Sequence, residues 1–207
     1  FFSSSRPEHF KILVQIYQKT VKKILEKRPN FKPILSISRA ITDDVLEDVK
    51  QRLDLSDFII IRANSLELLS IARLLVTIPG SNTAEAMYMH TPMLVVMPLN
   101  RPDLIQFDGL LGLLGKIPIL GWLLKTLVVN ILKRKKRFYS IPNMISKSAI
   151  VPEIVAKLEP KKLAKNILDL YEDEKQLIEI RENLSKTFKA SNDPLVQICK
   201  KIITLSS

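Results

Sequence analysis

The sequence predicts an α/β fold with a Rossmann-like, doubly wound parallel sheet. Several short apolar runs lack the polar alternation of a half-exposed strand, a pattern typical of parallel strands that are covered on both faces. These runs alternate with segments whose apolar residues recur at helical spacing. The chain has 207 residues, of which 46% are hydrophobic and 26% charged, so it is long enough for one such domain with appended helices.

Strands and helices are expected to alternate up to residue 99. The first helix is predicted at 7–27, because Pro7 suits a first helical turn and apolar residues follow with helical spacing. Buried strands are predicted at 33–38, 57–63, 74–80 and 93–99. Helices are predicted between them at 42–53, 65–72 and 82–90, and again at 160–172, 174–189 and 193–204.

Cysteine content and net charge limit the function classes. Cys199 is the only cysteine, so the chain forms no internal disulfide and no cysteine-based metal site. The formal charge of +11 suggests a phosphate-bearing partner, which can be nucleic acid, anionic lipid or a nucleotide. The first residues include no initiator methionine and no signal-peptide pattern, and we expect the chain to be part of a longer protein.

An apolar segment with a basic end interrupts the α/β pattern at 104–137. Residues 109–132 read GLLGLLGKIPILGWLLKTLVVNIL. Pro118 and Gly121 divide this run into two pieces, each shorter than the ~20 residues that a transmembrane helix needs. The basic end consists of Lys133, Arg134, Lys135, Lys136 and Arg137.

We interpret this segment as a membrane-surface anchor. Trp122 suits the level of the lipid headgroups, and the clustered cations suit lipid phosphates. Residues 109–137 contain seven cations and no acid, so most of the net charge is local. The alternative is a buried helical hairpin with a solvated basic face. Nucleic acid is not an expected partner, because aromatic residues do not interleave with the cations and no nucleic-acid-binding motif is present.

The first candidate phosphate-binding loop is the segment SSSR at residues 3–6. Its hydroxyl groups, among them that of Ser5, stand directly before the first predicted helix. The guanidinium of Arg6 and the free N–H groups of the helix start both suit a phosphate. By itself the loop is more typical of an ordinary serine-rich helix start.

The second candidate loop is PGSNTAEAM at residues 79–87, between a predicted strand and a helix. Gly80 permits a tight turn, and Ser81, Asn82 and Thr83 follow as capping residues at a helix end that favours anions. Glu85, one turn into the helix, can accept hydrogen bonds from ribose hydroxyls. A carboxylate that complements the helix dipole is the simpler interpretation of Glu85 alone.

Together with a third segment at 141–154, IPNMISKSAIVPEI, these loops resemble the C-terminal half of lipid-A-disaccharide synthases. That family joins two acylated glucosamine units, uses a UDP-sugar donor and has the two-domain GT-B fold. Its Pro-Gly-Ser-Arg loop is similar to residues 3–6, and its Ser-Gly-Thr-x-Thr-Leu-Glu loop to residues 79–85. Its Pro-Asn and Val-Pro-Glu motifs are similar to residues 142–143 and 151–153, in the same order.

The resemblance implies a binding site for the sugar donor. Arg6 and the turn at 81–83 would bind the diphosphate, Glu85 would bind the ribose, and Asn143 and Glu153 would shape the donor pocket. The complete set of implied donor-binding residues is Ser5, Arg6, Gly80, Ser81, Asn82, Thr83, Glu85, Asn143 and Glu153.

The resemblance also implies the chemistry. An acceptor hydroxyl would attack the anomeric carbon of a UDP-sugar, with an N-acetylglucosamine-type unit expected, while UDP leaves and the configuration inverts. Arg6 and a helix N-terminus would stabilise the charge on the departing diphosphate, so no metal or other cofactor is required. The catalytic base is expected in the N-terminal half of the complete enzyme, and this chain alone should be inactive. His9 and His90 are interpreted as ordinary helix-end residues.

The sequence departs from the family pattern at three places. Ser4 replaces a glycine, residues 79–81 read Pro-Gly-Ser instead of Ser-Gly-Thr, and Ala156 replaces a Gln. These differences concern the identity of the sugar donor more than the fold. The long insertion suggests a divergent branch of the family, whose acceptor can differ from a lipid A precursor. The alternative functions are a same-fold glycolipid or peptidoglycan-precursor transferase and a catalytically inactive, membrane-associated nucleotide-binding module.

We expect a nucleotide-sugar-binding domain at 1–160, which includes the insertion at 104–137, followed by C-terminal helices at 161–207. These helices should pack on the domain, cross to the missing N-terminal domain or reach a second subunit of a homodimer. The expected partners are a UDP-sugar donor, a lipid acceptor and an anionic membrane. The expected setting is bacterial lipid A biosynthesis, at the periphery of the inner membrane on its cytoplasmic face.

Overall fold

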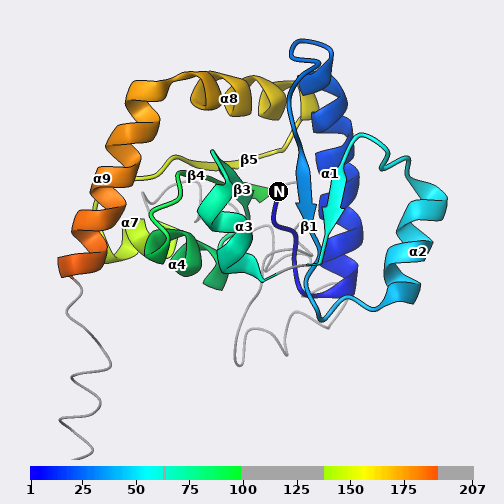
Figure 1. Ribbon diagram of the computed structural model, residues 1–207, viewed down its shortest axis with the longest axis horizontal. Coiled ribbons are helices and arrows are strands. Elements are labelled where there is room, and N and C mark those ends of the chain that lie inside the picture. The colour runs from blue at the N-terminus through cyan, green and yellow to red at the C-terminus, as the bar shows by residue number, and fades with distance from the viewer. Residues whose placement is uncertain (63, 99–137, 191–207) are drawn as a thin grey trace, which may run out of the picture.

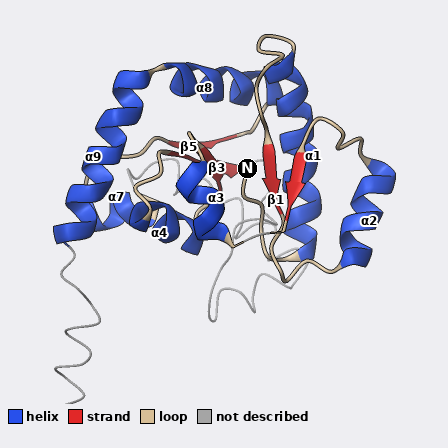
Figure 2. Ribbon diagram, viewed as in Figure 1, coloured by secondary structure: helices blue, strands red, loops and turns tan. Residues whose placement is uncertain are grey.

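The structure, a computed structural model, describes residues 1–62, 64–98 and 138–190. Figures 1 and 2 show short strands with helices around them. The strands are β1 (Ile34–Ser36), β2 (Ile59–Ile61), β3 (Leu75–Thr77), β4 (Met93–Pro98) and β5 (Glu153–Ala156). The helices are α1 (Pro7–Leu25), α2 (Asp43–Arg52), α3 (Ser65–Ile71), α4 (Ser81–Tyr88), α7 (Ile141–Ser146), α8 (Pro160–Glu172) and α9 (Glu174–Ala190).

The strand pairs in the described part of the chain are all parallel. β1 pairs with β2, and Leu35 lies opposite Ile60. β4 lies between β3 and β5, and its Val95 is in register with Thr77 on one side and Glu153 on the other. Parallel neighbours need long crossover connections, which the helices supply here.

Residues 1 and 2 join these two groups of strands into one sheet. The N–H of Ser36 donates to the carbonyl of Phe1 (3.0 Å), and the N–H of Phe2 donates to the carbonyl of Val76 (2.9 Å). Phe2 and Ser36 also form a parallel bridge. Figure 1 shows the N-terminus between β3 and β1. The order across the sheet is therefore β2, β1, residues 1–2, β3, β4 and β5.

The helices pack in two groups, as a doubly wound sheet requires. α1 packs against α8, whereas α4 packs against α3, α7 and α9, and the consecutive helices α8 and α9 connect the two groups. The chain leaves residues 1–2 toward β1 in one direction and leaves β3 toward β4 in the opposite direction. Because parallel crossovers are right-handed, α1 and α4 belong on opposite faces of the sheet. The Rossmann-like, doubly wound parallel sheet is confirmed.

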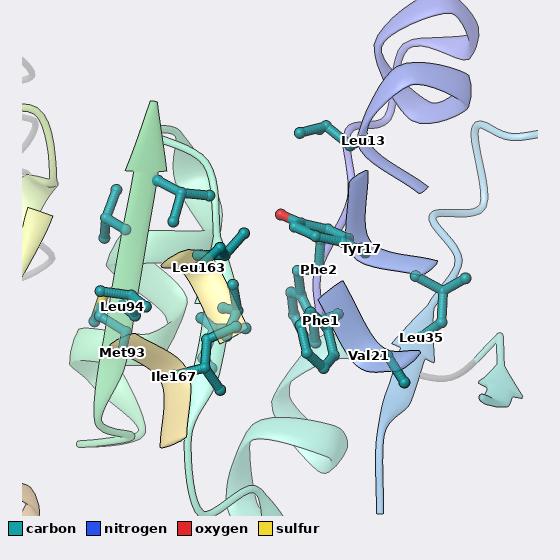
Figure 3. Packing of buried hydrophobic residues seen from close by; sticks show 14 of the residues in the cluster. Phe1, Phe2, Leu13, Tyr17, Val21, Leu35, Met93, Leu94, Leu163 and Ile167 are labelled. Atoms are coloured by element: carbon teal, nitrogen blue, oxygen red, sulfur yellow. The ribbon is translucent and has the colours of Figure 1, made fainter. Parts of the chain in front are cut away.

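A cluster of buried apolar residues holds the sheet and the helices together (Figure 3). Leu13, Tyr17 and Val21 of α1 are fully buried, and Leu94 of β4 is 2% exposed. Burying one such aliphatic side chain contributes about 1.5–3 kcal/mol, so this cluster is a large source of stability. The hydroxyl of Tyr17 donates to the carbonyl of Phe2 (3.4 Å), and burial raises the pKa of this hydroxyl well above its ordinary value.

The strand β2 is more exposed to solvent than the sequence predicts. The run 57–63 is predicted to be a buried strand, but β2 covers only its middle, and the side chain of Ile59 is 48% exposed. Within the described residues β2 pairs with β1 alone, so it lies at an edge of the sheet. An apolar run identifies the strand but does not show whether anything covers its outer side.

Two elements between residues 141 and 156 are absent from the sequence prediction. The helix α7 has only six residues, and β5 has only four, which start with a glutamate and include a short apolar run of three residues. The predicted helix at 193–204 and the insertion at 104–137 lie outside the described residues.

Replacement of Ile167 by alanine tests the packing of α8. Ile167 is fully buried, so we expect Ile167→Ala to lower the free energy of unfolding by about 2–5 kcal/mol in urea denaturation. Ile178 of α9 is 47% exposed, and Ile178→Ala is the matched control, with an expected loss below about 1 kcal/mol. Equally small losses in both variants would contradict the packing of α8 in the core.

Candidate functional site

A cleft of about 810 Å³ opens at the carboxyl edge of the sheet. Residues that directly follow residues 1–2, β1 and β3 line it, together with the end of β4. The crossovers on the two sides of residues 1–2 run in opposite directions, so the loops at this point diverge and leave a crevice. Ligands of doubly wound sheets bind at this position.

The loop at residues 3–6 forms one wall of the cleft. Ser3 and Ser4 are buried, whereas Ser5 and Arg6 are exposed. The N–H of Arg6 donates to the Oγ of Ser4 (3.1 Å), and the Oγ of Ser3 donates to the carbonyl of Ser36 (3.4 Å). Serine at position 4 therefore shapes the turn that leads into α1. No side chain caps the N-terminus of α1, so its first N–H groups can meet an anion.

The turn at Gly80 forms the opposite wall. Gly80 has φ +152° and ψ −169°, a backbone conformation that residues with a Cβ rarely adopt. Ser81 and Asn82 follow in the first turn of α4, and both line the cleft. The Nδ2 of Asn82 donates to the Oγ1 of Thr77 (3.4 Å), which fixes this side chain beside the end of β3. Gly80 itself offers no capping side chain to α4.

Glu85 presents a carboxylate to the same cleft from the second turn of α4. One of its oxygen atoms, Oε2, is buried and has no hydrogen-bond partner among the described residues. A buried acceptor without a partner is unusual in a folded protein. As a residue that lines the cleft, Glu85 can also accept a hydrogen bond from a ligand hydroxyl.

Thr83 does not line the cleft, although it belongs to the same turn. Its side chain is fully buried. The hydroxyl donates to the carbonyl of Gly80 (2.7 Å) and accepts from the N–H of Ile141 (3.1 Å). Thr83 therefore holds the glycine turn in place and connects it to the start of α7.

Asn143 is 1% exposed and uses its polar atoms within the protein. Its Nδ2 donates to the carbonyl of Val151 (2.9 Å) and to Oε1 of Glu153 (2.8 Å). Its Oδ1 accepts from the N–H groups of Ile150 and Val151, both at 2.9 Å. These four hydrogen bonds close the loop between α7 and β5.

Glu153 completes this network from the first position of β5. Its carboxylate accepts from the N–H groups of Tyr139 (3.1 Å) and Ser140 (2.8 Å) and from the Oγ of Ser140 (2.6 Å). Neither Asn143 nor Glu153 lines the cleft. The structure thus brings Ser5, Arg6, Gly80, Ser81, Asn82 and Glu85 together around the cleft, while direct binding of the donor by Thr83, Asn143 and Glu153 stays a prediction.

The sequence prediction does not include the wall that follows β1. Ser36, Ile37, Ser38 and Arg39 all line the cleft, and Arg39 adds a second guanidinium. No motif marks a single arginine in a loop, so only the pairing of β1 with residues 1–2 could reveal it. The two histidines do not line the cleft. In the described part of the chain, no three side chains of the types that bind metal ions are grouped.

The predicted membrane-surface residues Trp122 and Lys133, Arg134, Lys135, Lys136 and Arg137 lie outside the described residues. Among the residues that the structure does describe, no helix is both long enough and apolar enough to cross a membrane.

Comparison with known proteins identifies one family. The model of the family described as lipid-A-disaccharide synthetase matches residues 1–106. This match includes all the residues that line the cleft, among them the walls at Arg6, at Arg39 and at Gly80. No curated protein matches the chain.

Replacement of Asn143 by alanine tests the network that closes the loop before β5. Asn143→Ala removes four hydrogen bonds and leaves buried N–H groups without partners, so we expect a loss of about 2–4 kcal/mol in the free energy of unfolding. Asn183→Ala on α9 is the control, because no side-chain hydrogen bond involves Asn183 in the described part of the chain. Its expected loss is below about 1 kcal/mol.

Proposed function

The chain belongs to the lipid-A-disaccharide synthetase family, and from this membership we propose that it is the donor-binding half of a lipid-directed glycosyltransferase. Members of this family are glycosyltransferases with the GT-B fold. We propose that the complete protein transfers a sugar of the N-acetylglucosamine type from a UDP-sugar to a lipid acceptor.

The cleft at the carboxyl edge of the sheet is the observation that carries this proposal. With a volume of about 810 Å³ it has the size of a small-molecule site. Arg6 and the uncapped N-termini of α1 and α4 supply positive charge and N–H donors for a diphosphate. The carboxylate of Glu85, a residue that lines the cleft, supplies an acceptor for the ribose hydroxyls.

The same groups account for the role of this half in the reaction. Negative charge grows on the diphosphate as the bond to the sugar breaks, and Arg6 with the helix N-termini stabilises that charge. In this proposal no metal ion or other cofactor takes part. Among the residues that line the cleft in the described ranges, Glu85 is the only carboxylate. In this proposal Glu85 binds the ribose, and the catalytic base comes from the N-terminal half.

We further propose that the segment at 104–137 holds the protein at the cytoplasmic surface of the inner membrane. The support comes from the sequence, in which apolar pieces with Trp122 are followed by the five cations of 133–137. A lipid acceptor is confined to the membrane, so a transferase attached there meets its substrate in two dimensions.

Hydrogen exchange in the presence of UDP tests the donor site. At millimolar UDP we expect slower exchange of the backbone amides in the first turns of α1 and α4, because these N–H groups would face the diphosphate. Amides in α8 serve as the internal control and should not change. Equal exchange with and without UDP would contradict the donor site. The effect should persist in EDTA, and a requirement for a divalent cation would contradict the metal-free proposal.

Binding to liposomes tests the membrane proposal. Replacement of the cations at 133–137 by glutamine should weaken binding to vesicles that contain anionic lipid by roughly fivefold for each charge removed, because each cation near such a surface contributes about 1 kcal/mol. Glutamine at Lys161 and Lys162, two exposed cations of α8, is the matched control. Unchanged binding in the first variant would refute an electrostatic anchor.

A further inference from the structure

Arginines in the described part of the chain fall into two groups. Arg28, Arg52, Arg62 and Arg73 each form an ion pair with an aspartate or glutamate. Arg6 and Arg39 have no ion pair within the described ranges, and both line the cleft. Arg181 of α9 is also without an ion pair there, but it does not line the cleft. The lack of an ion pair alone therefore does not identify a ligand-binding arginine. The arginine must also line the cleft.

The loop after β1 holds Arg39 at a fixed place. The N–H of Ile41 donates to the carbonyl of Ser38 (3.0 Å), and the N–H of Ala40 donates to the Oγ of Ser38 (3.3 Å). Arg39 is therefore a central residue of a tight turn. Its own N–H and carbonyl are not part of these bonds, and its exposed side chain is left for the cleft.

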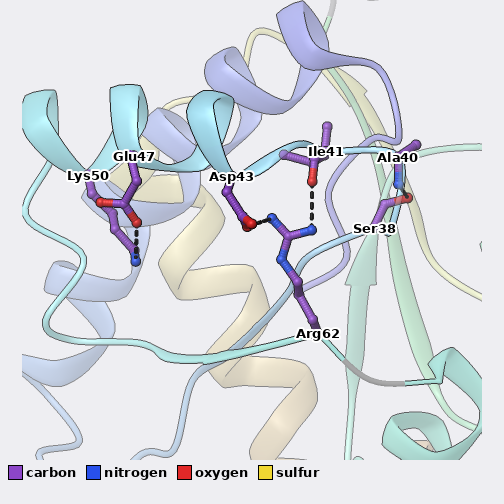
Figure 4. A network of polar contacts seen from close by, with 7 residues as sticks. All are labelled: Ser38, Ala40, Ile41, Asp43, Glu47, Lys50 and Arg62. Atoms are coloured by element: carbon purple, nitrogen blue, oxygen red, sulfur yellow. Dashed lines mark hydrogen bonds and ion pairs between the residues drawn. The ribbon is translucent and has the colours of Figure 1, made fainter.

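Arg62 braces this turn from the end of β2 (Figure 4). Its Nη1 donates to the carbonyl of Ile41 (2.6 Å), and its Nη2 donates to the carboxylate of Asp43 at the start of α2 (2.8 Å). The two neighbouring arginines thus have different tasks. The guanidinium of Arg62 is hydrogen-bonded to the loop. The guanidinium of Arg39 forms no hydrogen bond or ion pair with another described residue, so its N–H donors can bind a ligand.

The sheet brings Arg39 and Arg6 to the same edge. Residues 1–2 and β1 are parallel neighbours, so the loops that follow them both emerge at their carboxyl ends. The hydroxyl-bearing Ser36 and Ser38 also line the cleft. Glu85 is the only acid that lines the cleft in the described residues, so two unpaired cations outnumber it.

We propose that Arg39 is a second cationic contact for the diphosphate and that Arg6 and Arg39 together select a nucleoside diphosphate over a monophosphate. A guanidinium matches one phosphate group with two parallel N–H donors, so two of them match two adjacent phosphates. This inference rests on the proposed function of the cleft as a donor site. It adds a residue outside the motifs that mark the family and assigns it a role in specificity.

Calorimetric titration of the 207-residue chain with UDP, UMP and uridine tests the proposal. Arg39→Gln should weaken UDP binding roughly tenfold, because one charge-assisted contact is lost. The same variant should change UMP binding by less than about threefold and leave uridine binding unchanged. Arg39→Lys, which keeps the charge, should recover part of the affinity for UDP. Arg181→Gln is the matched control, with the same charge change at an unpaired arginine outside the cleft, and should bind all three ligands like the native chain.

The outcomes separate this inference from the proposed function. Native affinity for UDP in Arg39→Gln, together with weakened binding in Arg6→Gln, would overturn the role of Arg39 and leave the donor site intact. Equal losses for UDP and UMP would overturn the selection of a diphosphate, and an equal loss for uridine would show a structural role instead. If the native chain binds neither UDP nor UMP, the proposed donor site itself fails. Thermal melting of each variant verifies that it remains folded.

Discussion

Two backbone hydrogen bonds determine whether this chain has one sheet or two. They join the carbonyl of Phe1 to the N–H of Ser36 and the N–H of Phe2 to the carbonyl of Val76. The ring of Phe1 packs against Tyr17, with 5.2 Å between centroids, and against Phe58, with 5.8 Å between centroids. Because the loops at Arg39 and Gly80 follow strands on opposite sides of residues 1–2, the width of the cleft depends on this junction. The cleft and the core thus rest on the same residues.

Most of the fold could be predicted from the sequence, because most of its strands and helices show a hydrophobic pattern within their own residues. Apolar runs without alternation identified the strands β1 to β4, and helical spacing identified α1, α4 and α8, because burial on both faces or along one stripe leaves a direct trace in the sequence. β5 left no such trace. It begins with Glu153, whose carboxylate is used for hydrogen bonds, and its residues are only partly buried. The exposure of Ile59 was equally hidden, since it depends on what lies beside β2.

The candidate site could be predicted only in part. A sequence motif does not show which of its polar atoms already form hydrogen bonds within the protein. Arg6 and Glu85 both line the cleft, as a ligand-binding role requires. Asn143 and Glu153 belong to equally specific motifs, yet their hydrogen bonds go to each other and to the nearby backbone. The family pattern has a glycine where this chain has Ser4, and here the hydroxyl accepts from the N–H of Arg6, so the substitution is compatible with the turn. Arg39 has no motif at all, and it is found only through the neighbour relations of the sheet.

The hydroxyl of Thr83 connects the glycine turn of the cleft to a distant part of the chain. It bonds the carbonyl of Gly80 on one side and the N–H of Ile141 on the other, residues that are far apart in the sequence. Ile141 lies only four positions after the basic cluster that ends at Arg137. The Thr83 hydroxyl therefore ties the glycine turn to the start of α7, and α7 also packs directly against α4. One buried hydroxyl thus couples the glycine turn that lines the cleft to the position of α7.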